Sequence, residues 1–258
     1  MQKSYIWSLP TRVFHALFVL FILLAFLSAD EDRWLNYHAI IGYGVLILLV
    51  FRAFWGILGP KYSLFKDFPI GKEKAKEFIK NIFEDNQKYI GHNPLASYVM
   101  IAMLVVAFLT VITGVFAFGI QEGKGILSSF NSEFFKKMKL FKEIHEILST
   151  LFIVLIVAHV GGVLSDRLLH KKHETLNSII TGYKVTNNNE SIKLNIFQKI
   201  FAFFMFIIFI GFFAFNIYKP NNILVSSINK TVDYQTQNEV FVTECASCHT
   251  LYPSQSFA

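Results

Sequence analysis

Five long apolar stretches constrain this chain more than any other feature of its sequence. They cover residues 13–28, 37–58, 95–118, 144–165 and 196–217. A helix needs about 20 mostly apolar residues to cross the hydrocarbon core of a bilayer, and all but the first stretch meet that length. About half of the 258 residues are apolar and 29 are Phe, which is typical of a membrane protein. The predicted fold class is therefore an all-α integral membrane protein with five spans.

The first stretch also resembles a signal peptide. Lys3 and Arg12 precede its apolar run, and Ala29 follows it as a weak small-residue cleavage site. We interpret it as a span because it begins with a histidine that the later spans need as a partner.

Lysine and arginine in the loops predict the orientation, because cytoplasmic loops carry an excess of both. Residues 59–94 hold seven lysines, and the segment after the fourth span is also basic. The five lysines at 124–142 disagree, but the two strongly basic loops outweigh them. We expect a bacterial inner-membrane protein with a cytoplasmic N-terminus and a periplasmic C-terminus. The net charge of +6 follows from this topology, and nothing in the sequence indicates nucleic-acid binding.

Two histidines lie near opposite ends of the fourth span. Fourteen residues separate His145 from His159, so both rings project from one helix face roughly 21 Å apart. One metal ion cannot bridge that distance. Histidine inside a membrane is costly and usually functional, although either residue alone is equally well explained by hydrogen bonding between helices.

Two further histidines supply partners at matching depths. His15 lies near the cytoplasmic end of the first span and pairs by depth with His159. His38 lies at the periplasmic start of the second span and pairs with His145. Two imidazoles on opposite faces of a macrocycle are the ligands of a low-spin b haem, whereas zinc needs three or four ligands at one level. We therefore predict two b haems, with these four histidines as iron ligands.

Glycines and arginines near the histidines fit the same interpretation. Glycine would let a flat macrocycle approach a helix backbone, although small residues also serve ordinary helix packing. The glycines concerned are Gly42, Gly44, Gly161 and Gly162. Arginines at span ends could pair with haem propionates, and positive-inside anchoring explains three of them equally well. They are Arg12, Arg33, Arg52 and Arg167, of which Arg12 and Arg52 are the candidate propionate contacts. We expect the loop histidines at 92, 170 and 173 to be surface or supporting residues.

Several ordered motifs resemble one family. They are R-x-x-H from Arg12, H-x-x-x-G-Y from His38, R-x-x-W-G-x-x-G-P at 52–60, G-H-N-P at 91–94, E-I-H-E at 143–146 and H-E-x-L-N-S-x-x-T-G-Y-K at 173–184. Over about residues 7–184 the chain resembles the bacterial dihaem cytochrome b561 family, which includes the cytochrome b subunits of Ni,Fe-hydrogenases. The resemblance implies a four-helix core with two b haems, electron transfer across the membrane, and quinone chemistry near the cytoplasmic haem.

The C-terminal tail carries a different motif, Cys245-Ala-Ser-Cys248-His249. In C-x-x-C-H the two cysteines attach a haem covalently and the histidine binds its iron. A structural disulfide or half of a zinc site is the alternative. The fifth span places this motif in the periplasm, where c haem is attached. The surrounding residues resemble the start of a small periplasmic dihaem cytochrome c, but the chain ends nine residues later, so we expect this domain to be truncated.

These observations predict three regions and one main function. Residues 1–186 form the four-helix dihaem domain, 187–219 a connector with the fifth helix, and 220–258 a short periplasmic tail. We expect electron transfer through two b haems and one c haem, between the quinone pool and a periplasmic cytochrome c or oxidoreductase. The partners expected are membrane lipid, quinone and that periplasmic protein. Whether the chain is part of a quinone oxidoreductase, and whether it is a homo-oligomer, are left open.

Two other functions are compatible with parts of the sequence. One is a membrane anchor subunit for a periplasmic hydrogenase-like enzyme, which passes electrons inward to quinone. The other is a haem-free transporter whose histidines relay protons. The C-x-x-C-H motif counts against a transporter, which has no use for it.

Overall fold

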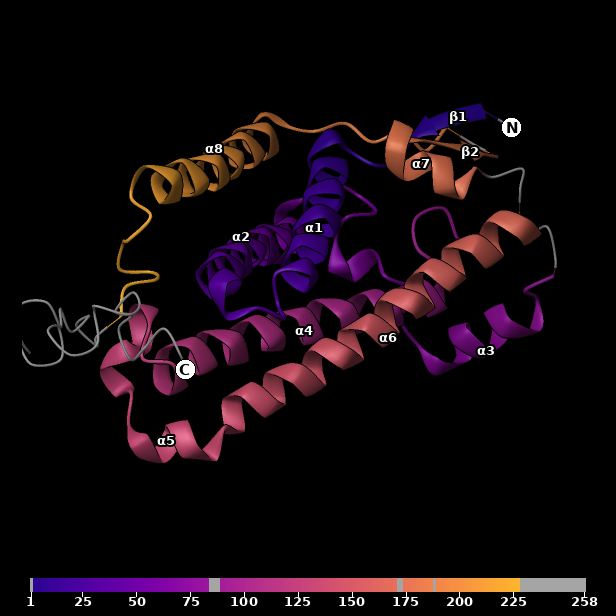
Figure 1. The fold of residues 1–258 in the computed structure, drawn as a ribbon. Helices are drawn as coiled ribbons and strands as arrows, with labels where there is room; N and C mark the ends of the chain where they lie inside the picture. Colours follow the sequence, from indigo (N-terminus) through magenta and orange to yellow (C-terminus); the bar gives the residue numbers. More distant parts are fainter. Residues whose placement is uncertain (1, 84–88, 171–173, 188, 228–258) are drawn as a thin grey trace, which may run out of the picture.

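The computed structural model describes residues 2–83, 89–170, 174–187 and 189–227, and its main feature is a set of long apolar helices (Figure 1). These are α1 (Leu9–Leu27), α2 (Leu35–Leu58), α4 (Pro94–Phe116), α6 (Leu140–Leu169) and α8 (Ile196–Tyr218). Within the described part of the chain, five helical segments are long and apolar enough to cross a membrane, which confirms the predicted fold class. The helix α6 extends about one turn beyond both ends of the predicted span.

Four of the long helices pack in two pairs, and the fifth, α8, lies to one side of them (Figure 1). The helix α4 packs against α6, α1 packs against α2, and α2 also contacts α4 and α8. Buried residues of α2, α4 and α6 form one core cluster: Val45, Leu49, Val106, Ala107, Val111 and Phe152. A second cluster joins α1, α2 and α8 around Trp55 and Phe209. The fifth helix is thus attached to the bundle through α1 and α2.

Local sequence signals explain where the helices begin. Proline lies in the first turn of both α1 and α4, where its missing N–H costs no hydrogen bond. The Asn93 side chain caps α4 by accepting a hydrogen bond of 2.8 Å from the Ala96 N–H. Asn195 and Gln198 form a reciprocal capping box at the start of α8.

One end of the bundle carries a small sheet, and we call it the sheet end. Here β1 (Gln2–Tyr5) pairs antiparallel with β2 (Tyr183–Thr186), and α7 (Thr175–Thr181) leads into β2. The hydroxyls of Ser4 and Thr186 are hydrogen-bonded at 2.6 Å. Gly182 joins α7 to β2 with a positive φ of 89°. The sheet was not expected, because strands of four residues are too short to show a reliable alternation in sequence.

The opposite end, which we call the loop end, holds the α1–α2 turn and residues 117–139. That segment contains a π-helical turn (Ala117–Gln121), a 3-10 turn (Gly125–Phe130) and the short helix α5 (Glu133–Met138). The chain after α8 returns here, where the Ser226 carbonyl accepts a hydrogen bond of 2.9 Å from the Gly125 N–H. The predicted amphipathic helix between α2 and α4 is present as α3 (Lys72–Lys80). Cys245, Cys248, His249 and His173 lie outside the described residues.

Candidate functional site

The first candidate site lies at the loop end, where His38 of α2 faces His145 of α6. Their ring centroids are 6.1 Å apart and the ring planes are almost perpendicular, at 84°. Each ring is held through Nδ1 by a carbonyl of a neighbouring helix. His38 donates to the Ala25 oxygen at 3.0 Å, and His145 donates to the Thr110 oxygen at 2.8 Å. With the proton on Nδ1, each Nε2 keeps a free lone pair, which is the usual arrangement of a metal-binding histidine.

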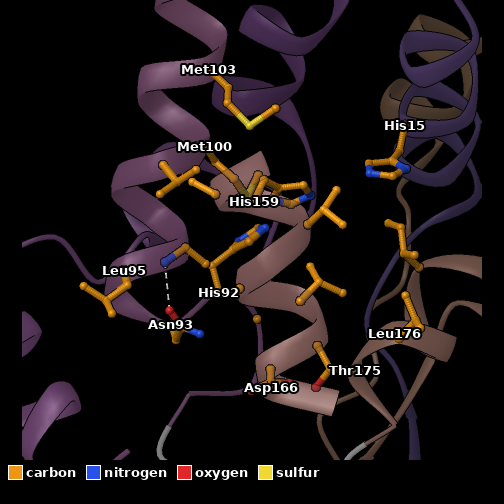
Figure 2. Close-up of a pocket in the computed structure, with 18 of the residues that line it drawn as sticks. His15, His92, Asn93, Leu95, Met100, Met103, His159, Asp166, Thr175 and Leu176 are labelled. Atoms are coloured by element: carbon orange, nitrogen blue, oxygen red, sulfur yellow. Dashed lines mark hydrogen bonds between the residues drawn. The ribbon is translucent and has the colours of Figure 1, made fainter. Parts of the chain in front are cut away.

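The second candidate site lies toward the sheet end, where His15 of α1 faces His159 of α6. Their ring centroids are 6.5 Å apart and the planes are inclined by 52°. Both rings line a cavity of about 1130 Å³ that lies between α1, α3, α4 and α6 and reaches α7 and β2. Figure 2 shows His15 and His159 on opposite sides of this space, with His92 beneath them. The structure therefore brings together the two pairs that helix depth predicts.

Both pairs have the spacing that a metal between two imidazoles requires. With a metal–nitrogen bond of about 2 Å and about 1 Å from nitrogen to ring centre, two trans imidazoles place their centroids roughly 6 Å apart. The observed separations are 6.1 and 6.5 Å. The cavity at the His15–His159 pair exceeds the roughly 300–1,000 Å³ of an ordinary small-molecule site, so this pair has room for a macrocycle. In the described residues, no group of three or more His, Cys, Asp or Glu gathers as a zinc site would require.

The four glycines differ in what surrounds them. Gly42 and Gly162 have no atom within 4 Å of an added Cβ, and Gly162 lines the cavity, so both leave room beside a helix backbone. Gly161 is also open but does not line the cavity. Gly44 instead meets the Phe213 ring of α8, 2.5 Å from an added Cβ, so it serves helix packing.

A glycine that the sequence analysis did not consider lies against one of the histidines. An added Cβ at Gly114 of α4 would be 2.9 Å from Cε1 of His145. Only glycine lets the ring lie this close to α4. The small-x-x-x-small spacing from Thr110 to Gly114 is the one sequence signal that could have pointed to it.

The arginines at the span ends differ in whether they line the cavity. Arg52 is buried, lines the cavity, and donates to the Ser63 carbonyl at 3.1 Å while its guanidinium lies over the Phe65 ring. Arg12 does not line the cavity, and its Nη1 donates to the Ile180 carbonyl. The structure therefore places Arg52 at the His15–His159 cavity but not Arg12.

The remaining two arginines lie away from the cavity. Arg33 forms a surface ion pair with Glu31, and Arg167 is exposed. Both are compatible with anchoring at the membrane surface.

His92 was expected to be a surface or supporting residue, and the structure places it in the cavity wall. Its ring packs between the rings of Trp7 and Phe68, with centroids 4.9 and 4.7 Å away. Burial, followed by the positive charges of Arg52 and Lys184, lowers the pKa of His92 to about 3. The imidazole is therefore neutral at physiological pH and available for hydrogen bonding or ring packing.

Two more charged residues of the cavity wall were missed by the sequence analysis. Lys184 of β2 is buried, and its amine donates to the Ile90 carbonyl at 3.0 Å. Burial lowers the pKa of Lys184, and the negative charge of Asp166 opposes that shift. Asp166 accepts from His170 Nδ1 at 3.1 Å through Oδ1, while its buried Oδ2 has no hydrogen-bond partner among the described residues. Lys184 is the last residue of the motif H-E-x-L-N-S-x-x-T-G-Y-K, and its place in that motif was the sequence signal that could have pointed to it.

Fold and site together define an all-helical integral membrane protein with cofactor-sized space and paired imidazoles between its helices. The family model of prokaryotic cytochrome b561 matches residues 6–182, and the chain belongs to this family. Membership implies b haem and electron transfer in a bacterial membrane. The searches of curated proteins and of solved structures found no match.

Proposed function

We propose that this protein carries electrons across the bacterial inner membrane through two b haems and one c haem. His15 and His159 would hold one b haem, and His38 and His145 the other. The observation that carries the proposal is the pair of facing imidazoles at each end of the bundle, with centroid separations that suit a shared metal. Haem iron supplies one-electron chemistry when bound, and its axial ligands help to set its potential.

The residues around the histidines support this role. The carbonyls of Ala25 and Thr110 orient His38 and His145 and keep their Nε2 atoms free for iron. At the other pair, Phe18 and Phe152 line the same cavity as His15 and His159. This apolar wall excludes water and raises the cost of a change in net charge, so it contributes to the potential.

The orientation in the membrane that we propose follows from the basic loops. With the N-terminus in the cytoplasm, the sheet end faces the cytoplasm and the loop end faces the periplasm. The C-x-x-C-H motif of Cys245, Cys248 and His249 then lies in the periplasm, where a c haem could exchange electrons with a cytochrome c or an oxidoreductase. Quinone would react near the sheet-end haem.

A membrane anchor subunit of a periplasmic hydrogenase-like enzyme is the second candidate. The observation that favours it is the basic surface at the loop end, where the positive-inside rule expects few lysines. Lys136, Lys137 and Lys139 are exposed beside Phe134, which is also exposed. Exposed charges can steer the approach of a protein partner, and exposed aromatic residues are enriched where partners dock.

Substitution of single histidines tests the proposal. His15→Ala and His159→Ala should remove the same component from the reduced-minus-oxidised spectrum of the purified protein. His38→Ala and His145→Ala should remove the other component, because each pair shares one iron. Loss of the same component in His15→Ala and His145→Ala would contradict the pairing.

A further inference from the structure

Two buried cations at the sheet end of the cavity have no carboxylate of a described residue bonded to them. Arg52 is 4% exposed and Lys184 is 6% exposed, and both line the cavity. Their hydrogen bonds go to the carbonyls of Ser63 and Ile90. Among the residues that the structure describes, neither forms a salt bridge. A buried cation without a counter-charge is costly, so this arrangement needs an explanation.

Both cations and His92 line this cavity. Besides burial, the positive charges of Arg52 and Lys184 both contribute to the lowered pKa of His92, whose ring lies between Trp7 and Phe68 in the cavity wall. Neutral His92 offers them no counter-charge. A carbonyl uses only one donor of each cation, so further donors remain on both groups.

Among the described residues, the two carboxylates that line the cavity, Asp166 and Glu77, form no salt bridge with Arg52 or Lys184. Asp166 lies near enough to affect Lys184, but it does not bond to Lys184, and its Oδ1 accepts from His170. Glu77 is exposed on α3. Arg52 and Lys184, the two best-buried cations of the cavity wall, are therefore available to an anion that enters the cavity.

The sheet fixes the position of Lys184. In the register of β1 and β2, Lys184 is opposite Ser4, which is fully buried. Successive side chains of a strand point to opposite faces, and Tyr183 beside Lys184 is accordingly exposed. The N-terminal strand thus holds the amine in the cavity wall, about 180 residues away in sequence.

We propose that Lys184 and Arg52 form an anion site for a carboxylate or phosphate group at the sheet end of the cavity. The inference rests on the proposed function, because the first expected source is the carboxylates of a haem held by His15 and His159. The second source is a free phosphate or the phosphate of a lipid headgroup. Lysine and arginine at a desolvated site recognise both by charge-assisted hydrogen bonds.

The test compares full-length purified protein with three variants. Lys184→Met removes the charge and keeps the volume of the side chain, and Lys184→Arg retains the charge. Lys3→Met is the matched control, because Lys3 is an exposed residue of the paired strand β1. The first measurement is the rate at which apomyoglobin, added as a scavenger, removes the sheet-end b haem. The second is the midpoint potential of that haem.

We expect Lys184→Met to release the sheet-end haem about tenfold faster than the wild type, because a desolvated charge pair slows dissociation. Its midpoint potential should fall, since a nearby cation favours the reduced, less positive haem. Lys184→Arg should restore most of both values, and Lys3→Met should match the wild type. Equal release rates and potentials in Lys184→Met and wild type would overturn the inference if phosphate also has no effect.

Reconstitution with haem dimethyl ester distinguishes the two sources. If haem carboxylates are the anion, wild type should release the ester faster than haem, and the difference between wild type and Lys184→Met should vanish. The comparison of haem with its ester in the wild type does not depend on the folding of any variant. If the anion is a phosphate, the difference should persist, and inorganic phosphate should raise the thermal midpoint of wild type but not of Lys184→Met.

The failure of this inference is separable from the failure of the proposed function. A wild-type protein without extractable haem would refute the function, and the phosphate titration would then decide the anion site alone. A haem-loaded wild type that is insensitive to the ester, to Lys184→Met and to phosphate would refute the anion site only.

Discussion

Replacing Gly114 by alanine should damage one of the two proposed haem sites and spare the other. The new methyl group would be 2.9 Å from Cε1 and 3.1 Å from Nδ1 of His145, whereas ordinary contacts begin near 3.4 Å. The His145 ring cannot simply move away, because its Nδ1 is hydrogen-bonded at 2.8 Å to the carbonyl of Thr110, which lies on α4 with Gly114. It must swing by about 0.5 Å or break that bond. Either movement takes Nε2 of His145 out of line with His38.

The size of the effect follows from the cost of overpacking. An extra methyl group in a filled site costs about 1–3 kcal/mol. Since about 1.4 kcal/mol is tenfold in an equilibrium constant, the loop-end site should bind haem roughly tenfold to a hundredfold more weakly. The sheet-end site does not contact Gly114 and should be unchanged.

The assay is a redox titration of purified Gly114→Ala, combined with its haem-to-protein ratio. Gly211→Ala is the matched control, because Gly211 lies on α8 with no atom within 4 Å of an added Cβ. We expect loss or displacement of the component that His38→Ala also removes, and a normal titration for the control. Full occupancy and unchanged potentials in Gly114→Ala, or loss of the component that depends on His15, would refute the reasoning.

Three further predictions concern the connector, the tail and α8. Hydrogen bonds from Lys61 and Tyr62 lower the pKa of Glu190 below its ordinary 4.5, so its stabilisation is present above that value and is lost as pH falls through the lowered pKa. Glu190→Gln should therefore lower the free energy of unfolding at pH 7 by less than about 1 kcal/mol, which a lower thermal midpoint would report. The difference in midpoint between the variant and the wild type should shrink in acid. Cys248→Ala should abolish haem staining on a denaturing gel while both b components remain in the spectrum; persistent staining would contradict covalent attachment there. Gly44→Leu should clash with the α8 ring that lies 2.5 Å from an added Cβ, and lower the thermal midpoint without changing haem content; an unchanged midpoint would show that α8 adapts.

The spans and the histidine pairs could be predicted because both depend on simple lengths. A bilayer fixes how many apolar residues a helix needs, and the helical rise fixes the depth of each histidine. His145 and His159 therefore had to lie at different depths, and His38 and His15 were the residues available at those depths. This reasoning needs no knowledge of how the helices pack laterally.

The cavity wall could not be predicted, because it depends on contacts between distant parts of the chain. Lys184 appeared to be one more loop lysine until β1 paired with β2 and buried it. His92 likewise lies in a loop, and only the aromatic rings of Trp7 and Phe68 enclose it. For Gly44 the sequence left haem contact and helix packing both open, because the position of α8 cannot be read from its composition, and the structure shows packing against α8.

The haem content of the purified wild-type protein tests the central claim most directly. A reduced-minus-oxidised spectrum, followed by acid-acetone extraction, separates non-covalent b haem from covalent c haem. The account predicts two extractable b haems and one covalent haem per chain. Protein that contains no extractable haem would contradict the assignment of the paired histidines as iron ligands.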